Sequence, residues 1–221
     1  MNKKYKTILI TGAGGGLGTA LIDELNGRGY RLILTTKSSS LDRYFDMPDI
    51  ISVKGDITDQ KFRVELAVIA ARNDVDVIVN NAAKYVCKPF DQTNIDTFIS
   101  VIDTNFISAV AMTQLVWGIF KRKKAGLVLN INSVAGKKGG DGESAYSSSK
   151  FALAGFAESI RHDAKKYNIS VVDIFPGAFK TKMLKDRTDF ESLRGPKEVA
   201  QEIKSIITKY FDDNWGNGKN E

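Results

Sequence analysis

Six short apolar runs alternate with longer helical segments along the whole chain. The runs show little alternation between apolar and polar residues, which is typical of strands that are buried on both faces. Strands that alternate with helices indicate βαβ units and a parallel sheet. We therefore predict an α/β fold, a three-layer doubly wound parallel sheet of about six strands. The predicted strands are Lys6–Thr11, Tyr30–Thr36, Ile50–Val53, Val75–Asn80, Gly126–Asn132 and Ile169–Phe175.

The segments between these strands carry apolar residues at helical spacing. The longest, Ile95–Lys121, is apolar on more than one stripe, so we expect it to pack on the sheet and on something else. We expect a single domain over residues 1–221, in which 211–221 form a polar, frayed tail and no seventh strand. The other predicted helices are Thr19–Arg28, one capped by Asp59, Glu143–Tyr167 and Pro196–Phe211.

Composition indicates an ordinary globular protein, with 43% apolar and 26% charged residues. The net charge of +6 is scattered, and the dense run Lys121–Lys124 reads as a helix end facing water, so nucleic-acid binding is not expected.

The single cysteine, Cys87, fits a reducing compartment and is expected to be buried or half-buried. The single histidine, His162, reads as a surface residue without metal-ligand spacing. We see no signal segment and no apolar run of membrane-spanning length, and expect a cytoplasmic protein that binds no metal and no membrane.

A glycine-rich stretch, TGAGGGLG at Thr11–Gly18, lies between the first predicted strand and the first predicted helix. Glycine lets the backbone turn sharply and approach a pyrophosphate, and a helix N-terminus offers free N–H groups and a positive dipole end. Many tight turns need glycine for other reasons, so the glycines alone say little. Their position between strand and helix indicates a dinucleotide-binding turn.

The end of the second predicted strand bears on the choice of cofactor. Enzymes that use NAD often place an acidic residue there, on the ribose 2′-hydroxyl. This chain has Thr36 and Lys37 instead, and their hydroxyl and ammonium groups suit a 2′-phosphate. We therefore predict NADP (NADPH) as the cofactor and NAD as the less favoured one. The alternative is that Lys37 is simply a loop lysine.

The stretch from Ser133 to Lys150 carries a serine, a tyrosine at 146 and a lysine four residues later. Tyr146 and Lys150 would share one face of a helix. A nearby ammonium favours the phenolate and lowers the pKa of a phenol from its usual value of about 10. Ser133 could hold a carbonyl oxygen beside that phenol, which predicts a proton-transfer site for a carbonyl and alcohol pair. Alone, the tyrosine and lysine could equally be a solvated surface pair.

Further motifs along the chain are Asp56, NNAA (Asn80–Ala83), Asn105 and PGAFKT (Pro176–Thr181). Together with the glycine-rich stretch and the stretch from Ser133 to Lys150, they resemble the short-chain dehydrogenase/reductase family in its standard single-domain form, which has a Rossmann-type sheet. The resemblance covers nearly the whole chain. The chain departs from the family at Ala83, where glycine is usual, and in the absence of a seventh strand. The matching residues are TGAGGGLG (Thr11–Gly18), Asp56, NNAA (Asn80–Ala83), Asn105, Ser133, YSSSK (Tyr146–Lys150) and PGAFKT (Pro176–Thr181).

The resemblance implies four catalytic residues. Tyr146 would be the general acid in carbonyl reduction and the base in alcohol oxidation. Lys150 would lower the pKa of Tyr146 and hold the nicotinamide ribose. Ser133 would orient the substrate oxygen and stabilise its developing charge. Asn105 would hold a water that links Lys150 to solvent.

The resemblance also implies a cofactor site. Asp56 would accept a hydrogen bond from the adenine amino group, Asn81 and Ala82 would line the adenosine ribose, and Pro176–Thr181 would flank the nicotinamide. Hydride transfer itself belongs to the cofactor. The residues expected to bind it are Gly12, Gly15, Gly16, Leu17, Gly18, Thr36, Lys37, Asp56, Ile57, Asn81, Ala82, Ala83, Tyr146, Lys150, Pro176, Gly177, Phe179 and Thr181.

We therefore expect an NADP-preferring oxidoreductase that interconverts a small-molecule carbonyl and a secondary alcohol. One alternative is a dinucleotide-binding regulatory protein that has lost catalysis. Another is a sugar-nucleotide-modifying relative, whose glycine spacing fits Gly12, Gly15 and Gly18. Since family tetramers also use the seventh strand, we expect a homodimer through the two long helices. The expected substrate-contacting loops are Lys84–Gln92, Ala135–Ser144 and Lys182–Arg194.

Overall fold

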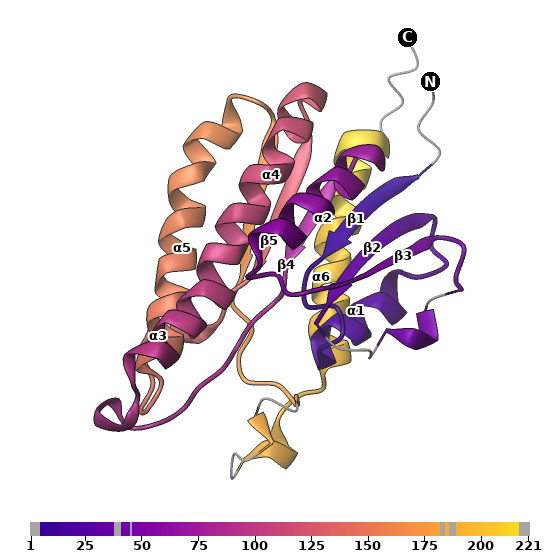
Figure 1. Ribbon diagram of the computed structural model, residues 1–221. Helices are drawn as coiled ribbons and strands as arrows, with labels where there is room; N and C mark the ends of the chain where they lie inside the picture. The colour runs from indigo at the N-terminus through magenta and orange to yellow at the C-terminus, as the bar shows by residue number, and fades with distance from the viewer. Residues whose placement is uncertain (1–4, 38–40, 45, 182–183, 186–188, 217–221) are drawn as a thin grey trace.

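The computed structural model describes residues 5–37, 41–44, 46–181, 184–185 and 189–216. Six strands, all parallel, form one sheet in the order β3-β2-β1-β4-β5-β6 (Figure 1). The predicted doubly wound architecture is confirmed. The strands are β1 (Lys6–Ile10), β2 (Tyr30–Thr36), β3 (Ile50–Lys54), β4 (Val77–Asn80), β5 (Gly126–Ile131) and β6 (Ile169–Ile174).

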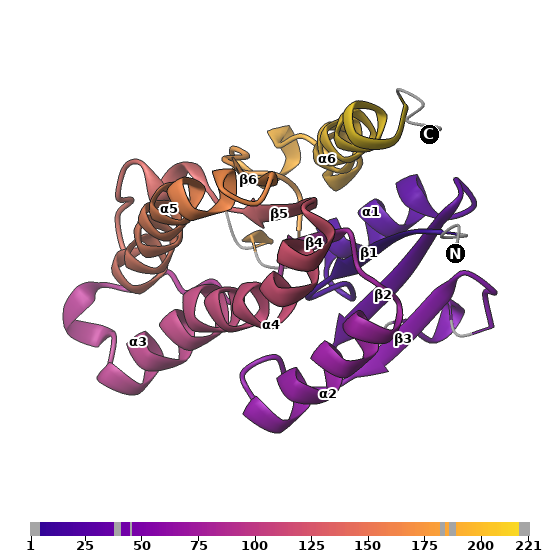
Figure 2. The same ribbon diagram turned by 90° about the horizontal axis from the view of Figure 1, so that it is seen from above.

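The helices lie in two layers, one on each face of the sheet (Figure 2). The helices α1 and α6 cover one face, and α2, α4 and α5 cover the other. Alternate residues of one strand enter different cores: Ile8 and Ile10 pack towards α1 and α6, and Leu9 packs towards α2 and α4. This burial on both faces explains the unbroken apolar runs. The helices are α1 (Gly16–Leu25), α2 (Gln60–Arg72), α3 (Ile95–Ile102), α4 (Ser108–Lys123), α5 (Ser144–Lys165) and α6 (Pro196–Phe211).

The long helix predicted at Ile95–Lys121 is interrupted. A π-helical turn at Asp103–Ile107 joins α3 to α4, and nothing in the sequence pattern indicated it. The combined helix Ile95–Lys123 is by length and composition apolar enough to cross a membrane, contrary to our sequence expectation. The inner residues of α4, Met112, Val116 and Phe120, are fully buried against the sheet, as in the core helix of an α/β fold.

The ends of several elements differ from the sequence prediction. Helix α1 begins at Gly16, inside the glycine run, because glycines that form the turn can also start the helix. Asp59 caps α2 as predicted, since its carboxylate accepts from the Lys61 N–H at 2.7 Å. After α6, a π-helical turn continues the chain over Asp212–Gly216, part of the predicted frayed tail, and residues 217–221 lie outside the described residues.

One lysine of the Lys121–Lys124 run turns inward, which corrects the expectation that the whole run faces water. The Lys123 ammonium donates to the Asp76 carboxylate and to the carbonyls of Asp74 and Val75, at 3.0 and 3.2 Å. The Asp76 side chain is fully buried and also accepts from the Thr7 N–H at 2.8 Å. The pair therefore fixes the end of α4 to the chain that enters β4.

We expect Asp76→Asn to lower the free energy of unfolding by roughly 3 kcal/mol, because it removes the buried carboxylate that both the Lys123 ammonium and the Thr7 N–H contact. Urea denaturation would measure the change. The matched control is Asp163→Asn, which removes a carboxylate from a pair whose side chains are 66% exposed, and it should leave the midpoint unchanged. Equal stability of Asp76→Asn and the unmodified protein would contradict this account.

Candidate active site

A large cavity of about 1540 Å³ opens at the carboxyl ends of the strands. Its walls come from the glycine turn after β1, from the chain that follows β2 to β6, and from the start of α5. Open α/β sheets bind ligands at this edge, where the strand order reverses between β1 and β4. Every residue that the sequence predicted to bind cofactor lines this cavity, and so do Ser133, Tyr146 and Lys150.

The glycine turn has the close packing that a phosphate-binding loop needs. Gly12 has a φ of 62°, and a Cβ there would lie 2.6 Å from the Cα of Ala82. A Cβ at Gly18 would lie 2.6 Å from the carbonyl oxygen of Ala13. Gly15, at the N-cap of α1, has no side chain to cap the helix, and Gly15–Gly18 line the cavity. These features fit a dinucleotide pyrophosphate.

The turn is held by the first residues after β4. The Asn81 amide donates to the carbonyls of Thr11 and Gly12, at 3.0 and 2.9 Å. The Thr11 hydroxyl oxygen accepts from the N–H groups of Asn81 and Ala82, at 3.0 and 3.1 Å. Asn81 lines the cavity, but its amide holds the turn together.

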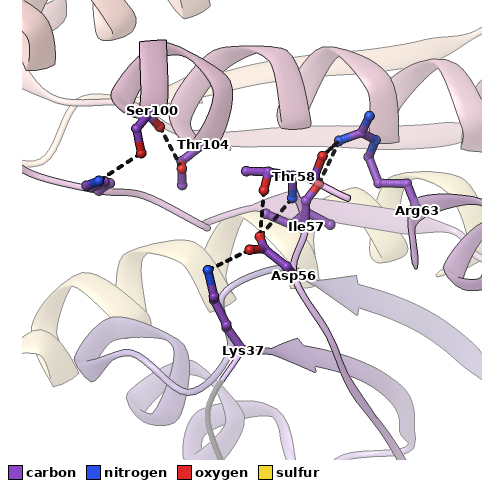
Figure 3. Close-up of polar contacts among 8 residues, drawn as sticks. Lys37, Asp56, Ile57, Thr58, Arg63, Ser100 and Thr104 are labelled. Atoms are coloured by element: carbon purple, nitrogen blue, oxygen red, sulfur yellow. Dashed lines mark hydrogen bonds and ion pairs between the residues drawn. The ribbon is translucent and has the colours of Figure 1, made fainter. Parts of the chain in front are cut away.

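Two residues that were predicted to bind different parts of the cofactor are partners in the structure. The Lys37 ammonium lies 2.5 Å from the Asp56 carboxylate, as Figure 3 shows. The other carboxylate oxygen accepts from the N–H and hydroxyl of Thr58, at 3.0 and 2.8 Å. Lys37 and Thr58 hold the pKa of Asp56 down at about 2. Arg63 fixes the same turn by donating to the carbonyls of Ile57 and Thr58 (Figure 3).

This ion pair affects how the part of the cavity that was predicted to bind adenosine can hold a ligand. Lys37 is 78% exposed, so a phosphate can reach its ammonium from solvent. Asp56 is the more fixed partner, because Thr58 holds one of its oxygens. A ligand that brings a phosphate to Lys37 therefore competes with Asp56 for the same ammonium. Arg43 also lines this cavity, but its guanidinium lies near Asp23 at 3.4 Å, and sequence reasoning did not find it.

Ser133, Tyr146 and Lys150 meet on one wall of the cavity, because β5 ends at Ile131 and α5 begins at Ser144. Ser133 starts a short 3₁₀ turn, and its hydroxyl oxygen accepts from the Ala135 N–H at 3.1 Å. Lys150 is buried, and its ammonium donates to the Ile131 carbonyl at 2.7 Å and lies 5.7 Å from the centre of the Tyr146 ring.

The pKa values of this pair differ from the sequence expectation that Lys150 lowers the pKa of Tyr146. Burial raises the pKa of Tyr146; the Ser133 hydroxyl opposes the rise, and the Glu143 charge adds to it. Burial lowers the pKa of Lys150 to about 8, against the opposing charge of Asp173. Burial penalises the charged form of each group, so both tend towards their neutral forms.

Asn105 lies behind the cavity wall in the π-helical turn and does not line the cavity. Its side-chain oxygen accepts from the Lys84 N–H at 2.6 Å. Its amide group donates to the Lys84 carbonyl and to the Ser149 hydroxyl, both at 2.9 Å. The side chain therefore ties the chain after β4 to α5. π-Helical turns are frequent at functional sites.

The chain after β6 closes the cavity over the glycine turn. Thr181 packs on Gly16, where a Cβ would lie 3.7 Å from its methyl carbon. The Lys180 N–H donates to the Arg194 carbonyl at 2.9 Å, which anchors the far end of this connection. Of the predicted substrate loop 182–194, residues 182–183 and 186–188 lie outside the described residues.

The cavity is also lined by Tyr85, Cys87 and Glu143. All three lie in loops that the sequence predicted to contact substrate, Lys84–Gln92 and Ala135–Ser144, although sequence reasoning did not single out Tyr85 or Glu143. Cys87 is exposed, which corrects the expectation of a buried or half-buried residue, and its sulfur lies 3.7 Å from the Asp141 carbonyl oxygen.

Comparison with known proteins agrees with this geometry. A family profile described as short chain dehydrogenase matches residues 6–192. An acetoacetyl-CoA reductase from Acinetobacter sp. (strain RA3849) is 29% identical over 94% of this chain and 92% of its own length. An NADP-dependent 3-hydroxy acid dehydrogenase from Schizosaccharomyces pombe is 33% identical over 80% of this chain and 72% of its own length.

Among solved structures, a 4-hydroxyisoleucine dehydrogenase mutant complexed with NADH and succinate shares the fold. It has a TM-score of 0.86 at 23% identity, over 93% of each chain. The profile match spans most of the chain, including the glycine turn and the Tyr146 region. The chain therefore belongs to the short chain dehydrogenase family and is an NAD(P)-dependent dehydrogenase/reductase.

Proposed function

We propose that this protein is an NADP(H)-preferring oxidoreductase that interconverts a carbonyl and a secondary alcohol, with Tyr146 as the general acid and base. The observation that carries the proposal is that Ser133, Tyr146 and Lys150 share one cavity with the glycine turn. A hydroxyl, a phenol and an ammonium thus face the same space as a dinucleotide-binding loop.

The bound nicotinamide supplies or accepts the hydride. Tyr146 gives its hydroxyl proton to the carbonyl oxygen during reduction and takes a proton from the alcohol during oxidation. Ser133 donates a hydrogen bond to the same substrate oxygen and stabilises its developing charge. Lys150, fixed by the Ile131 carbonyl, supplies a cation next to Tyr146.

The names of two relatives bear on the substrate. One is an acetoacetyl-CoA reductase and the other a 3-hydroxy acid dehydrogenase, and both names describe an oxygen on the third carbon of an acyl chain. We propose the same class, a 3-oxo or 3-hydroxy acyl compound, as the first to test here. The single cysteine supports a cytoplasmic setting, which is part of the proposal.

Tyr146→Phe should lower kcat for carbonyl reduction by roughly 10²–10⁴-fold, because it removes the proposed proton donor and leaves the ring. Cofactor affinity should stay near that of the unmodified protein. Tyr167→Phe, which makes the same change outside the cavity, is the control for loss of a tyrosine hydroxyl. Turnover of NADPH with 3-oxo acyl compounds is the assay, and near-full turnover of Tyr146→Phe would refute this mechanism.

The preference for NADP is proposed from Thr36 and Lys37 at the end of β2 and is supported by the name of the Schizosaccharomyces pombe relative. We expect Lys37→Asp to weaken NADPH binding roughly tenfold to a hundredfold, since it replaces a charge-assisted contact by repulsion. NADH binding should change little or improve. Lys61→Asp makes the same charge change outside the cavity and should not alter either affinity.

Fluorescence titration of both cofactors measures these affinities. If the unmodified protein binds NADH as tightly as NADPH, the proposed preference is wrong.

We also propose a homodimer through α3, α4 and α5. Several large apolar side chains on these helices, or on the π-helical turn between α3 and α4, are exposed: Ile95, Ile99, Ile107, Leu115 and Phe151. A two-fold pairing would cover this surface in both subunits. Leu153 and Ala157, also on α5, are buried within the chain and cannot contribute to this surface.

Light scattering at micromolar concentration should give twice the chain mass of 24.3 kDa. Ile99→Glu should shift the protein towards a monomer, because a carboxylate would be buried at the interface. Val64→Glu on α2, also at an exposed position, is the control. A clean tetramer or a stable monomer of the unmodified protein would contradict the proposal.

A further inference from the structure

A second tyrosine packs against Tyr146 and is hydrogen-bonded to a carboxylate. The Tyr85 hydroxyl donates to the Glu143 carboxylate at 2.7 Å. The rings of Tyr85 and Tyr146 meet edge to face, with their centres 4.9 Å apart and their planes at 80°. Tyr85 comes from the chain after β4, while Glu143 directly precedes α5, so tertiary folding brings the three together.

Glu143 is held in place by its backbone as well as by Tyr85. Its N–H donates to the Gly140 carbonyl at 3.2 Å, and its carbonyl accepts from the Ser147 N–H at 2.7 Å. A Cβ at Gly140 would lie 2.5 Å from the second oxygen of Glu143, so glycine leaves the room that the carboxylate occupies. The carboxylate is therefore a built part of the cavity wall.

The groups around Tyr146 come from three parts of the chain. Lys150 lies on the same helix, α5, and Glu143 directly precedes that helix. Ser133 follows β5, while Tyr85 and Cys87 follow β4. The Lys150 ammonium is directed to the Ile131 carbonyl. Burial raises the pKa of Tyr85, with Glu143 and Cys87 adding to the rise, so Tyr85 remains a hydrogen-bond donor to Glu143. The pKa of Tyr146 is raised by burial and by the charge of Glu143, against Ser133.

We propose that Glu143, held by Tyr85, is a positioning residue that keeps Tyr146 in its hydroxyl form and so sets the pH at which proton donation gives way to proton acceptance. In the proposed reduction, a hydride adds to the carbonyl carbon and the Tyr146 proton goes to the carbonyl oxygen, which leaves a phenolate. The Glu143 charge opposes that phenolate and favours its return to the hydroxyl form. The kinetic part of this inference rests on the proposed function, whereas the acid–base part concerns Tyr146 alone.

The direct test is Glu143→Gln, followed by titration of Tyr146 in protein labelled with ¹³C at the tyrosine Cζ. The chain has seven tyrosines, and the Tyr146 signal is the one missing in Tyr146→Phe. At a fixed alkaline pH, we expect the phenolate fraction of Tyr146 to be about threefold or more higher in Glu143→Gln, because a negative charge has been removed. If Tyr146 has the same phenolate fraction in Glu143→Gln as in the unmodified protein, the proposal is wrong.

Two control variants separate charge from structure. Tyr85→Phe keeps the ring and the Glu143 charge, so its Tyr146 should titrate closer to the unmodified protein than that of Glu143→Gln. Glu158→Gln removes an exposed charge from the same helix outside the cavity, and it should leave Tyr146 unchanged. If Glu158→Gln shifts Tyr146 as much as Glu143→Gln does, net charge is responsible and the proposal fails. If Glu143→Gln does not fold, Glu143→Ala removes the same charge and should also raise the phenolate fraction of Tyr146.

A kinetic measurement separates this inference from the proposed function. In Glu143→Gln, the alkaline limb of kcat/KM for reduction and the acid limb for oxidation should both move to lower pH. Both limbs move to lower pH because the Glu143 carboxylate raises the pKa of Tyr146 in the unmodified protein. Without that carboxylate, the phenolate forms at a lower pH. Absence of turnover in the unmodified protein would refute the proposed function, and the titration would still decide the role of Glu143.

Discussion

The junction between β1 and β4 fixes the geometry of the whole cavity. These strands lie side by side, and the chain leaves them in opposite directions across the sheet. The Asn81 amide and the Thr11 hydroxyl close this junction with four hydrogen bonds between residues about seventy positions apart in sequence. Gly12 can then pack directly on Ala82. The glycine turn thus gets its shape from a second strand as well as from its own glycines.

Burial acts on both partners of the reactive pair in the same direction. It raises the pKa of Tyr146 and lowers that of Lys150, so each group resists its charged form before any ligand is considered. The i, i+4 spacing alone suggested a lysine that lowers the pKa of its neighbour. The structure shows that the environment of the pair matters more than the spacing, because Ile131 engages the ammonium and Glu143 adds an opposing charge.

The sequence predicted the elements well and the side-chain partners poorly. Apolar periodicity located all six strands, because burial on both faces leaves a continuous signal. The motifs and the family resemblance located many of the residues that line the cavity. The sequence predicted that Lys123 faces solvent and that Asn81 and Lys37 face a ligand. Their partners, Asp76, Gly12 and Asp56, are distant in sequence, and periodicity carries no information about such pairs.

The π-helical turn at Asp103–Ile107 also affects how the two halves of the long helix face their surroundings. Each residue rotates an α-helix by about 100°, so the wider turn offsets the angular phase of α4 relative to α3. That offset lets Asn105 point inward to Lys84 and Ser149 while Ile99 and Leu115 both remain on the outside. Deletion of one residue from this turn would restore a continuous α-helix and rotate one half against the other. The contacts of the buried Asn105 amide and the outward position of the apolar side chains therefore both depend on the rotation that this turn introduces. A deletion or insertion in the turn would disrupt one or the other.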